Sequence, residues 1–171
     1  MVSTGPTNVT PVGADGVVSF TNTKSAGAKL YQKTPNKAPV FMPADTSPER
    51  YTRYDGFIRE AAALYQIPEA LVRAVIRVES DFDPRAVSPA NARGLMQITP
   101  STAKVIESLS GGQTFNFNDL SDPDINIRYG TFYLHYLIQK FGDNEIAALA
   151  AYNAGETNVA NWGGSSLSLD D

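Results

Sequence analysis

The sequence predicts a mainly α-helical domain preceded by an N-terminal arm. Residues that cap helices stand directly before proline at three places after residue 46, and apolar residues there recur at helical spacing. The arm differs because six of the eleven prolines lie within residues 1–50, where helical periodicity is weak. We therefore expect an arm over residues 1–46 and one helical domain over residues 47–171.

Each predicted helix has a start or stop signal of its own. Pro68 opens the second helix without a polar residue before it, and Gly142 suits a left-handed stop after the fourth. The predicted helices span 48–65, 68–80, 100–109, 123–141 and 144–153, with a final turn after Gly155. The three pairs of a capping residue and proline are Ser47-Pro48, Thr99-Pro100 and Asp122-Pro123.

Three stretches do not read as helix. In the arm, residues 17–21 and 29–32 flank a turn at residues 24–27, a pattern that predicts a short β-hairpin. Residues 81–93 and 110–121 lack periodicity and predict loops. Because loops between rigid helices often assemble binding and catalytic sites, these two loops are candidate places for a site.

Composition excludes several function classes. The 171 residues carry a net charge of -4, no cysteine and one histidine, so thiol chemistry, a disulfide framework and a zinc-thiolate site are excluded. An acidic chain is a poor nucleic-acid binder, and no apolar run approaches the ~20 residues of a membrane helix. We expect a monomer without cofactor, metal, nucleic-acid partner, integral membrane segment or visible signal peptide.

Glu79 is the most informative single residue. It follows Val72, Val75 and Ile76 at helical spacing, so its carboxylate shares the apolar face of the predicted helix 68–80. Burial on that face would raise the pKa of the carboxyl, as a general acid requires. The alternative is that Glu79 caps or braces a neighbouring loop, and the spacing alone leaves both interpretations open.

Two further segments carry polar groups in apolar surroundings. Residues 94–97 combine glycine, leucine, methionine and glutamine, which could line a sugar site but equally form a turn before the next helix. Residues 151–155 place Tyr152 and Asn153 among small residues, which is equally typical of a tightly packed helix end. Taken singly, each segment favours the structural interpretation.

Together, Glu79-Ser80, residues 94–97 and residues 151–155 resemble, in order and spacing, the motifs of the soluble lytic transglycosylase family. The similarity extends over about residues 48–162 and implies a helical domain like that of goose-type lysozyme. It implies an enzyme, a glycan-cleaving lyase that breaks the β-1,4 bond between N-acetylmuramic acid and N-acetylglucosamine in peptidoglycan. Family members continue into a helix with a Tyr-Val pair, for which no matching tyrosine follows Gly155.

The resemblance also implies roles for individual residues. Glu79 would perform both proton transfers and leave a 1,6-anhydromuramoyl end, while Ser80 would orient the acid or the acetamide of the substrate. Met96 and Gln97 would contact sugar near the cleaved bond. Tyr152 and Asn153 would face Glu79 across the cleft. Glycan strands of peptidoglycan are then the expected partner, which places the protein in the periplasm or elsewhere in the cell envelope, or outside the cell.

Two alternatives remain open on the sequence. A hydrolytic goose-type muramidase would need a second carboxylate on the opposite face of the sugar, for which Asp81 and Asp83 are the nearest candidates. Turn chemistry favours the interpretation of Asp83 as a loop clamp, and Asp81 can cap the end of the helix. The other alternative is a catalytically silent domain that binds glycan.

Overall fold

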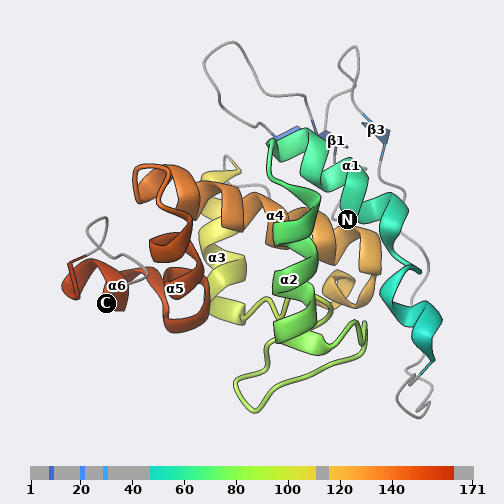
Figure 1. Ribbon diagram of the computed structural model, residues 1–171. Helices are drawn as coiled ribbons and strands as arrows, with labels where there is room; N and C mark the ends of the chain where they lie inside the picture. The colour runs from blue at the N-terminus through green and yellow to red at the C-terminus, as the bar shows by residue number, and fades with distance from the viewer. Residues whose placement is uncertain (1–7, 10–19, 22–28, 31–46, 111–115, 164–171) are drawn as a thin grey trace, which may run out of the picture.

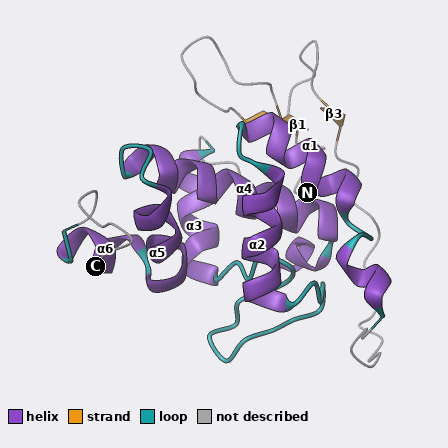
Figure 2. Cartoon of the chain, in the orientation of Figure 1, coloured by secondary structure: helices purple, strands orange, loops and turns teal. Residues whose placement is uncertain are grey.

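The computed structural model describes residues 8–9, 20–21, 29–30, 47–110 and 116–163. This part of the chain is mainly helical, which confirms the predicted fold class (Figures 1 and 2). The α-helices are α1 (Asp55–Tyr65), α2 (Glu69–Ser80), α3 (Pro100–Leu109), α4 (Pro123–Lys140), α5 (Glu145–Ala154) and α6 (Glu156–Asn161). Two short 3-10 helices, η1 (Pro48–Tyr51) and η2 (Phe117–Ser121), precede α1 and α4.

Two of the three predicted capping residues cap their helices. The Thr99 hydroxyl accepts a hydrogen bond from the backbone N–H of Thr102, and an Asp122 carboxylate oxygen accepts from the first turn of α4. The prediction for Ser47 is wrong, because its side chain makes no capping hydrogen bond. The predicted helix 48–65 is also interrupted. The first part is only the 3-10 helix η1, and α1 begins at Asp55 after a turn.

The predicted loop 110–121 contains an element that periodicity does not reveal. The Asn116 side chain accepts a hydrogen bond from the Asn118 N–H and opens η2, whose Leu120 is fully buried. A 3-10 helix of five residues is too short to show a repeating apolar pattern. Gly142 does take the predicted left-handed conformation after α4, with φ +66°.

Helix α4 forms the centre of the domain. It packs against α1, α3, α5 and η2, and Figure 1 shows it passing behind α2. Its buried face includes Ile127, Leu134 and Leu137, each fully removed from solvent. Within residues 47–110 and 116–163, none of the helices has the length and hydropathy that crossing a membrane requires.

The strands of the arm pair differently from the prediction. Strands β2 (Phe20–Thr21) and β3 (Lys29–Leu30) lie within the two predicted segments, but each pairs antiparallel with β1 (Asn8–Val9). The order β2-β1-β3 therefore replaces the direct hairpin, because an upstream strand lies between its two arms. The predicted turn at 24–27 lies outside the described residues, and the division at residue 46 stays a prediction.

Candidate functional site

Glu79 lies near the C-terminal end of α2, on the face that the spacing predicts. Val72, Val75 and Ile76 on that face are buried in the core, whereas Glu79 itself is half-buried. The carboxylate is thus at the margin of the core, where protein replaces part of its water. This burial raises the pKa of Glu79 above its ordinary value and favours the protonated form.

Ser80 joins the end of α2 to the segment 94–97. Its hydroxyl donates to the Leu95 carbonyl at 2.8 Å, with the Ile76 carbonyl at 3.2 Å as a second acceptor. The residue next to Glu79 is therefore anchored to another part of the chain rather than exposed to solvent. Such an anchor orients the last turn of the helix, on which the direction of the Glu79 side chain depends.

Tyr152 of α5 contacts the same segment, residues 94–97. Its hydroxyl donates to the Met96 carbonyl at 2.8 Å, and its ring lies 5.7 Å from that of Tyr133. Burial, with a smaller contribution from the negative charge of Glu79, raises the pKa of Tyr152 well above its ordinary value. Tyr152 therefore remains a protonated donor close to Glu79, and the structure brings all three motifs together.

Met96 requires a correction. Its side chain is fully buried: the Thr131 hydroxyl lies 3.7 Å from its sulfur, and a Cβ added at Gly130 would stand 2.5 Å from that atom. The predicted contact of this side chain with sugar is therefore not available in the structure. The reason is the missing side chain at Gly130, which opens a space in the core that Met96 fills.

The other two predicted contact residues differ in how they are held. The Gln97 amide nitrogen donates to the carbonyls of Ala86 and Gly94 at 3.0 and 2.9 Å, so this half of the side chain braces its own loop. Asn153 is exposed at the end of α5. Contact of either residue with substrate stays a prediction.

Asn126 is a key residue that sequence reasoning missed. It is fully buried in α4, and its carbonyl oxygen accepts from the Met96 N–H at 2.8 Å. Its amide nitrogen donates to the carbonyls of Arg93 and Leu120 at 2.8 and 3.0 Å. Only glycine fits at position 94 beside this amide, because a Cβ added at Gly94 would stand 2.2 Å from its nitrogen. An asparagine on the buried side of a helix is the signal that could have identified it.

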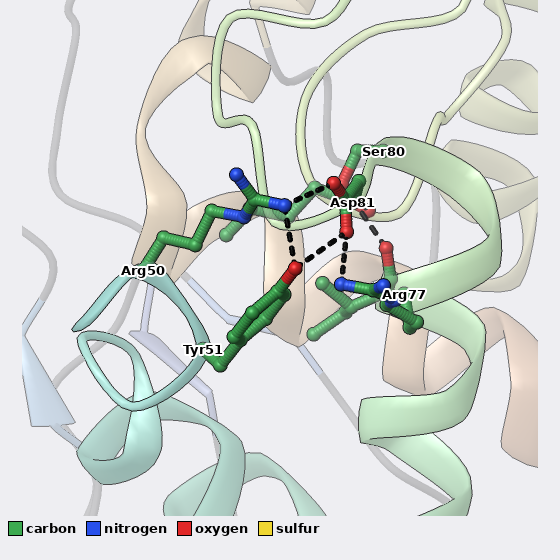
Figure 3. Close-up of polar contacts among 7 residues, drawn as sticks. Arg50, Tyr51, Arg77, Ser80 and Asp81 are labelled. Carbon is green, nitrogen blue, oxygen red and sulfur yellow. Dashed lines mark hydrogen bonds and ion pairs between the residues drawn. The ribbon is translucent and has the colours of Figure 1, made fainter. Parts of the chain in front are cut away.

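The two aspartates considered as second carboxylates both face arginines. Asp81 forms ion pairs with Arg50 and Arg77 at the end of α2 (Figure 3). Asp83 accepts from the Arg85 backbone N–H at 2.9 Å, with the Arg85 guanidinium beside it, which makes it the loop clamp that turn chemistry favours. Both carboxylates are therefore engaged in holding the chain around α2.

The part of the chain that the structure describes contains no group of three His, Asp or Glu side chains suited to a metal ion. His135 is half-buried in α4 and tilts against the ring of Tyr65, with 6.2 Å between the ring centres. Burial lowers the pKa of His135, which favours the neutral imidazole. These contacts give His135 a packing role in α4.

The transglycosylase SLT domain family matches residues 56–171. The soluble lytic murein transglycosylase of Escherichia coli strain K12 is 40% identical over 119 residues, covering 69% of this chain and 18% of that protein. The E. coli 70 kDa soluble lytic transglycosylase structure has a TM-score of 0.61 at 38% identity, covering 66% of this chain and 19% of that one.

An inactive glutamate-to-glutamine mutant of the lytic transglycosylase Slt from Pseudomonas aeruginosa also matches, with a TM-score of 0.61 at 33% identity. That match covers 67% of this chain and 18% of the other. The chain thus spans about a fifth of the length of each of these relatives, and the similarity falls on its helical part.

Proposed function

Because the chain belongs to the transglycosylase SLT domain family, we propose that it is a peptidoglycan lytic transglycosylase with Glu79 as its general acid and base. It cleaves the β-1,4 bond between N-acetylmuramic acid and N-acetylglucosamine. The observation that carries this proposal is the half-buried Glu79 carboxyl, placed where α2, the segment 94–97 and α5 meet. The substrate in turn assigns the protein to the cell envelope.

In the first step, Glu79 acts as an acid. Its carboxyl proton passes to the glycosidic oxygen as the bond from this oxygen to C1 of the muramoyl residue breaks, and the N-acetylglucosamine leaves with a new hydroxyl. The raised pKa of Glu79 keeps the proton available for this transfer. The N-acetyl group of the muramoyl residue assists, as in glycosidases that work without a second carboxylate.

In the second step, the Glu79 carboxylate acts as a base. It takes the proton of the C6 hydroxyl of the muramoyl residue while O6 attacks C1, which closes a 1,6-anhydro ring and returns Glu79 to its protonated form. No water is consumed. Tyr152 supports this cycle as a half-buried, protonated neighbour of Glu79, and Ser80 does so by fixing the end of α2.

The engagement of Asp81 and Asp83 by arginines favours this mechanism over hydrolysis. An inverting muramidase needs a free carboxylate to activate water on the opposite face of the sugar. Asp81 and Asp83 instead hold the chain beside α2. For binding of the glycan strand, the exposed Asn153 and the remaining amide oxygen of Gln97 are the proposed contacts.

Mass analysis of the products from purified peptidoglycan tests the proposal. A lytic transglycosylase releases fragments with anhydro ends, each one water lighter than the reducing end that hydrolysis produces. We expect the lighter product. Reducing ends would assign the protein to the muramidases, and binding of glycan without release of any fragment would assign it to the silent binding domains.

The proposed role of Glu79 also predicts how stability depends on pH. Since burial raises its pKa, the folded protein holds this proton more tightly than the unfolded chain, and the stability contributed is lost as pH rises through the folded pKa. Glu79→Gln removes the charge, so it should unfold at a higher temperature than the wild type near neutral pH. At about pH 3, below the ordinary glutamate pKa, the two should unfold together.

Thermal unfolding followed by circular dichroism at both pH values measures this difference. Glu69→Gln, at the exposed opposite end of α2, is the control for removal of a glutamate charge from the same helix. A Glu79→Gln protein that is less stable than the wild type near neutral pH would show that burial of the charge is not costly.

A further inference from the structure

The turn that follows α2 has an unfavourable backbone conformation. Asp81 and Phe82 both take left-handed φ angles, +50° and +63°, although neither is glycine. Such angles disfavour residues that carry a Cβ, and they persist only where surrounding contacts hold them. This turn begins two residues after Glu79, so the contacts that hold it also bear on the proposed catalytic residue.

Those contacts come from η1, about thirty residues upstream. The Arg50 guanidinium forms an ion pair with the Asp81 carboxylate, and the Tyr51 hydroxyl lies 3.4 Å from the second oxygen of that carboxylate (Figure 3). We call Arg50, Tyr51 and Asp81 the η1 clamp. Arg77, on α2 itself, pairs with the same carboxylate, and its guanidinium lies 4.6 Å from the centre of the Tyr51 ring.

The aromatic ring of Tyr51 holds the next residue of the turn. Phe82 is buried and meets the Tyr51 ring edge-on, with 5.5 Å between the ring centres. Tyr51 therefore contacts both left-handed residues, Asp81 through its hydroxyl and Phe82 through its ring. Ser80, which lies between Glu79 and this turn, is anchored to Leu95. The end of α2 is therefore held by contacts with two other segments, η1 and residues 94–97.

The η1 clamp joins the catalytic helix to a segment outside the matched family domain. The family match begins at residue 56, whereas Arg50 and Tyr51 precede it. The Asp81 side chain is 49% exposed, and ion pairs of such exposure contribute little to global stability. What the clamp can control is the geometry of the last helical turn.

We propose that Arg50, Tyr51 and Asp81 are positioning residues, which hold the turn after α2 and thereby direct Glu79 at the glycosidic bond. The inference rests on the proposed function of Glu79. The part of the chain needed for full activity then begins at η1, upstream of the matched family domain. Arg50 and Asp81 touch no reacting atom, so their effect passes through the position of Glu79.

The test measures the initial rate of anhydro-product release by the full chain over a range of peptidoglycan concentrations. Arg50→Ala and Asp81→Ala should each lower kcat about tenfold, within the loss that a displacement of about 1 Å can cause, and leave KM within about twofold. The double variant should be no slower than either single variant, because both break one contact. Arg50→Lys should recover part of the rate, since it keeps the charge but not the planar fork.

The control breaks another ion pair of α2, one that joins it to α1. Arg59 and Glu69 approach to 3.8 Å at the opposite end of α2, and Arg59→Ala should leave both kcat and KM at the wild-type values. Tyr51→Phe keeps the ring against Phe82 and removes only the hydroxyl. It should unfold at the wild-type temperature and release product more slowly, which separates positioning from folding.

Three results would overturn the inference: unchanged kcat in both alanine variants, an effect on KM alone, or loss of activity only in proportion to unfolded protein. Each of these leaves the proposed function standing, because the wild type still releases anhydro fragments. A wild type that releases none refutes the proposed function itself, and the inference falls with it.

Discussion

Replacement of Glu79 with glutamine is expected to lower the rate of fragment release from peptidoglycan by about 10²–10⁴-fold, the usual contribution of a general acid or base. Glutamine has the same shape but can neither donate the proton that frees the leaving sugar nor take the proton from the C6 hydroxyl. The rate is measured as soluble anhydro fragments released from purified peptidoglycan. Sedimentation with the insoluble polymer should show that the variant still binds.

Glu69→Gln is the matched control for this prediction. The replacement changes the same functional group on the same helix, but Glu69 is exposed at the opposite end of α2. The variant should therefore retain the wild-type rate. A Glu79→Gln protein as fast as the wild type would show that another group transfers the proton.

Replacement of Asn126 with alanine should lower the free energy of unfolding by about 2–4 kcal/mol, the largest loss of stability among the replacements considered. It leaves the Met96 N–H and the Leu120 carbonyl, 2.8 and 3.0 Å from the Asn126 amide, without that partner in the core. The Arg93 carbonyl still accepts from the Ile98 N–H, so the loss of its hydrogen bond to Asn126 costs less. Activity should fall as well, because the same amide holds the segment that anchors Ser80 and Tyr152.

Urea unfolding at equilibrium measures the difference in free energy. Asn161→Ala, an exposed asparagine of α6, serves as the control and should change stability by less than about 0.5 kcal/mol. Equal stability of Asn126→Ala and the wild type would mean that water or a rearranged loop satisfies the freed groups.

Local patterns predicted most of the helices and the orientation of Glu79. The spacing of Val72, Val75 and Ile76 places Glu79 on the inner face of α2, and Thr99 and Asp122 cap their helices as expected. These features depend on residues within one or two helical turns, so the signal is present in a short stretch of sequence. Ser47 makes no capping hydrogen bond, and the element that follows it is the four-residue 3-10 helix η1.

The sequence predicted which motifs meet at the candidate site, but not the direction of every side chain in it. The order of the motifs indicated that Glu79, Ser80 and Tyr152 belong together, and the structure brings them together. It could not indicate that the Met96 side chain turns away into the core, because that direction depends on the space beside Gly130. Nor could it assign the Gln97 amide nitrogen to the carbonyls of its own loop.

The sequence by itself determined most of the helices, the excluded chemistries and the carboxylate on which the proposed mechanism depends. Only the tertiary structure decided that Asn126 ties α4 to the segment 94–97, that Arg50 reaches Asp81, and that β1 lies between β2 and β3. The Arg50–Asp81 contact spans 31 positions and the Met96–Asn126 contact spans 30. Contacts of this range depend on how whole elements pack, and no short-range pattern encodes that packing.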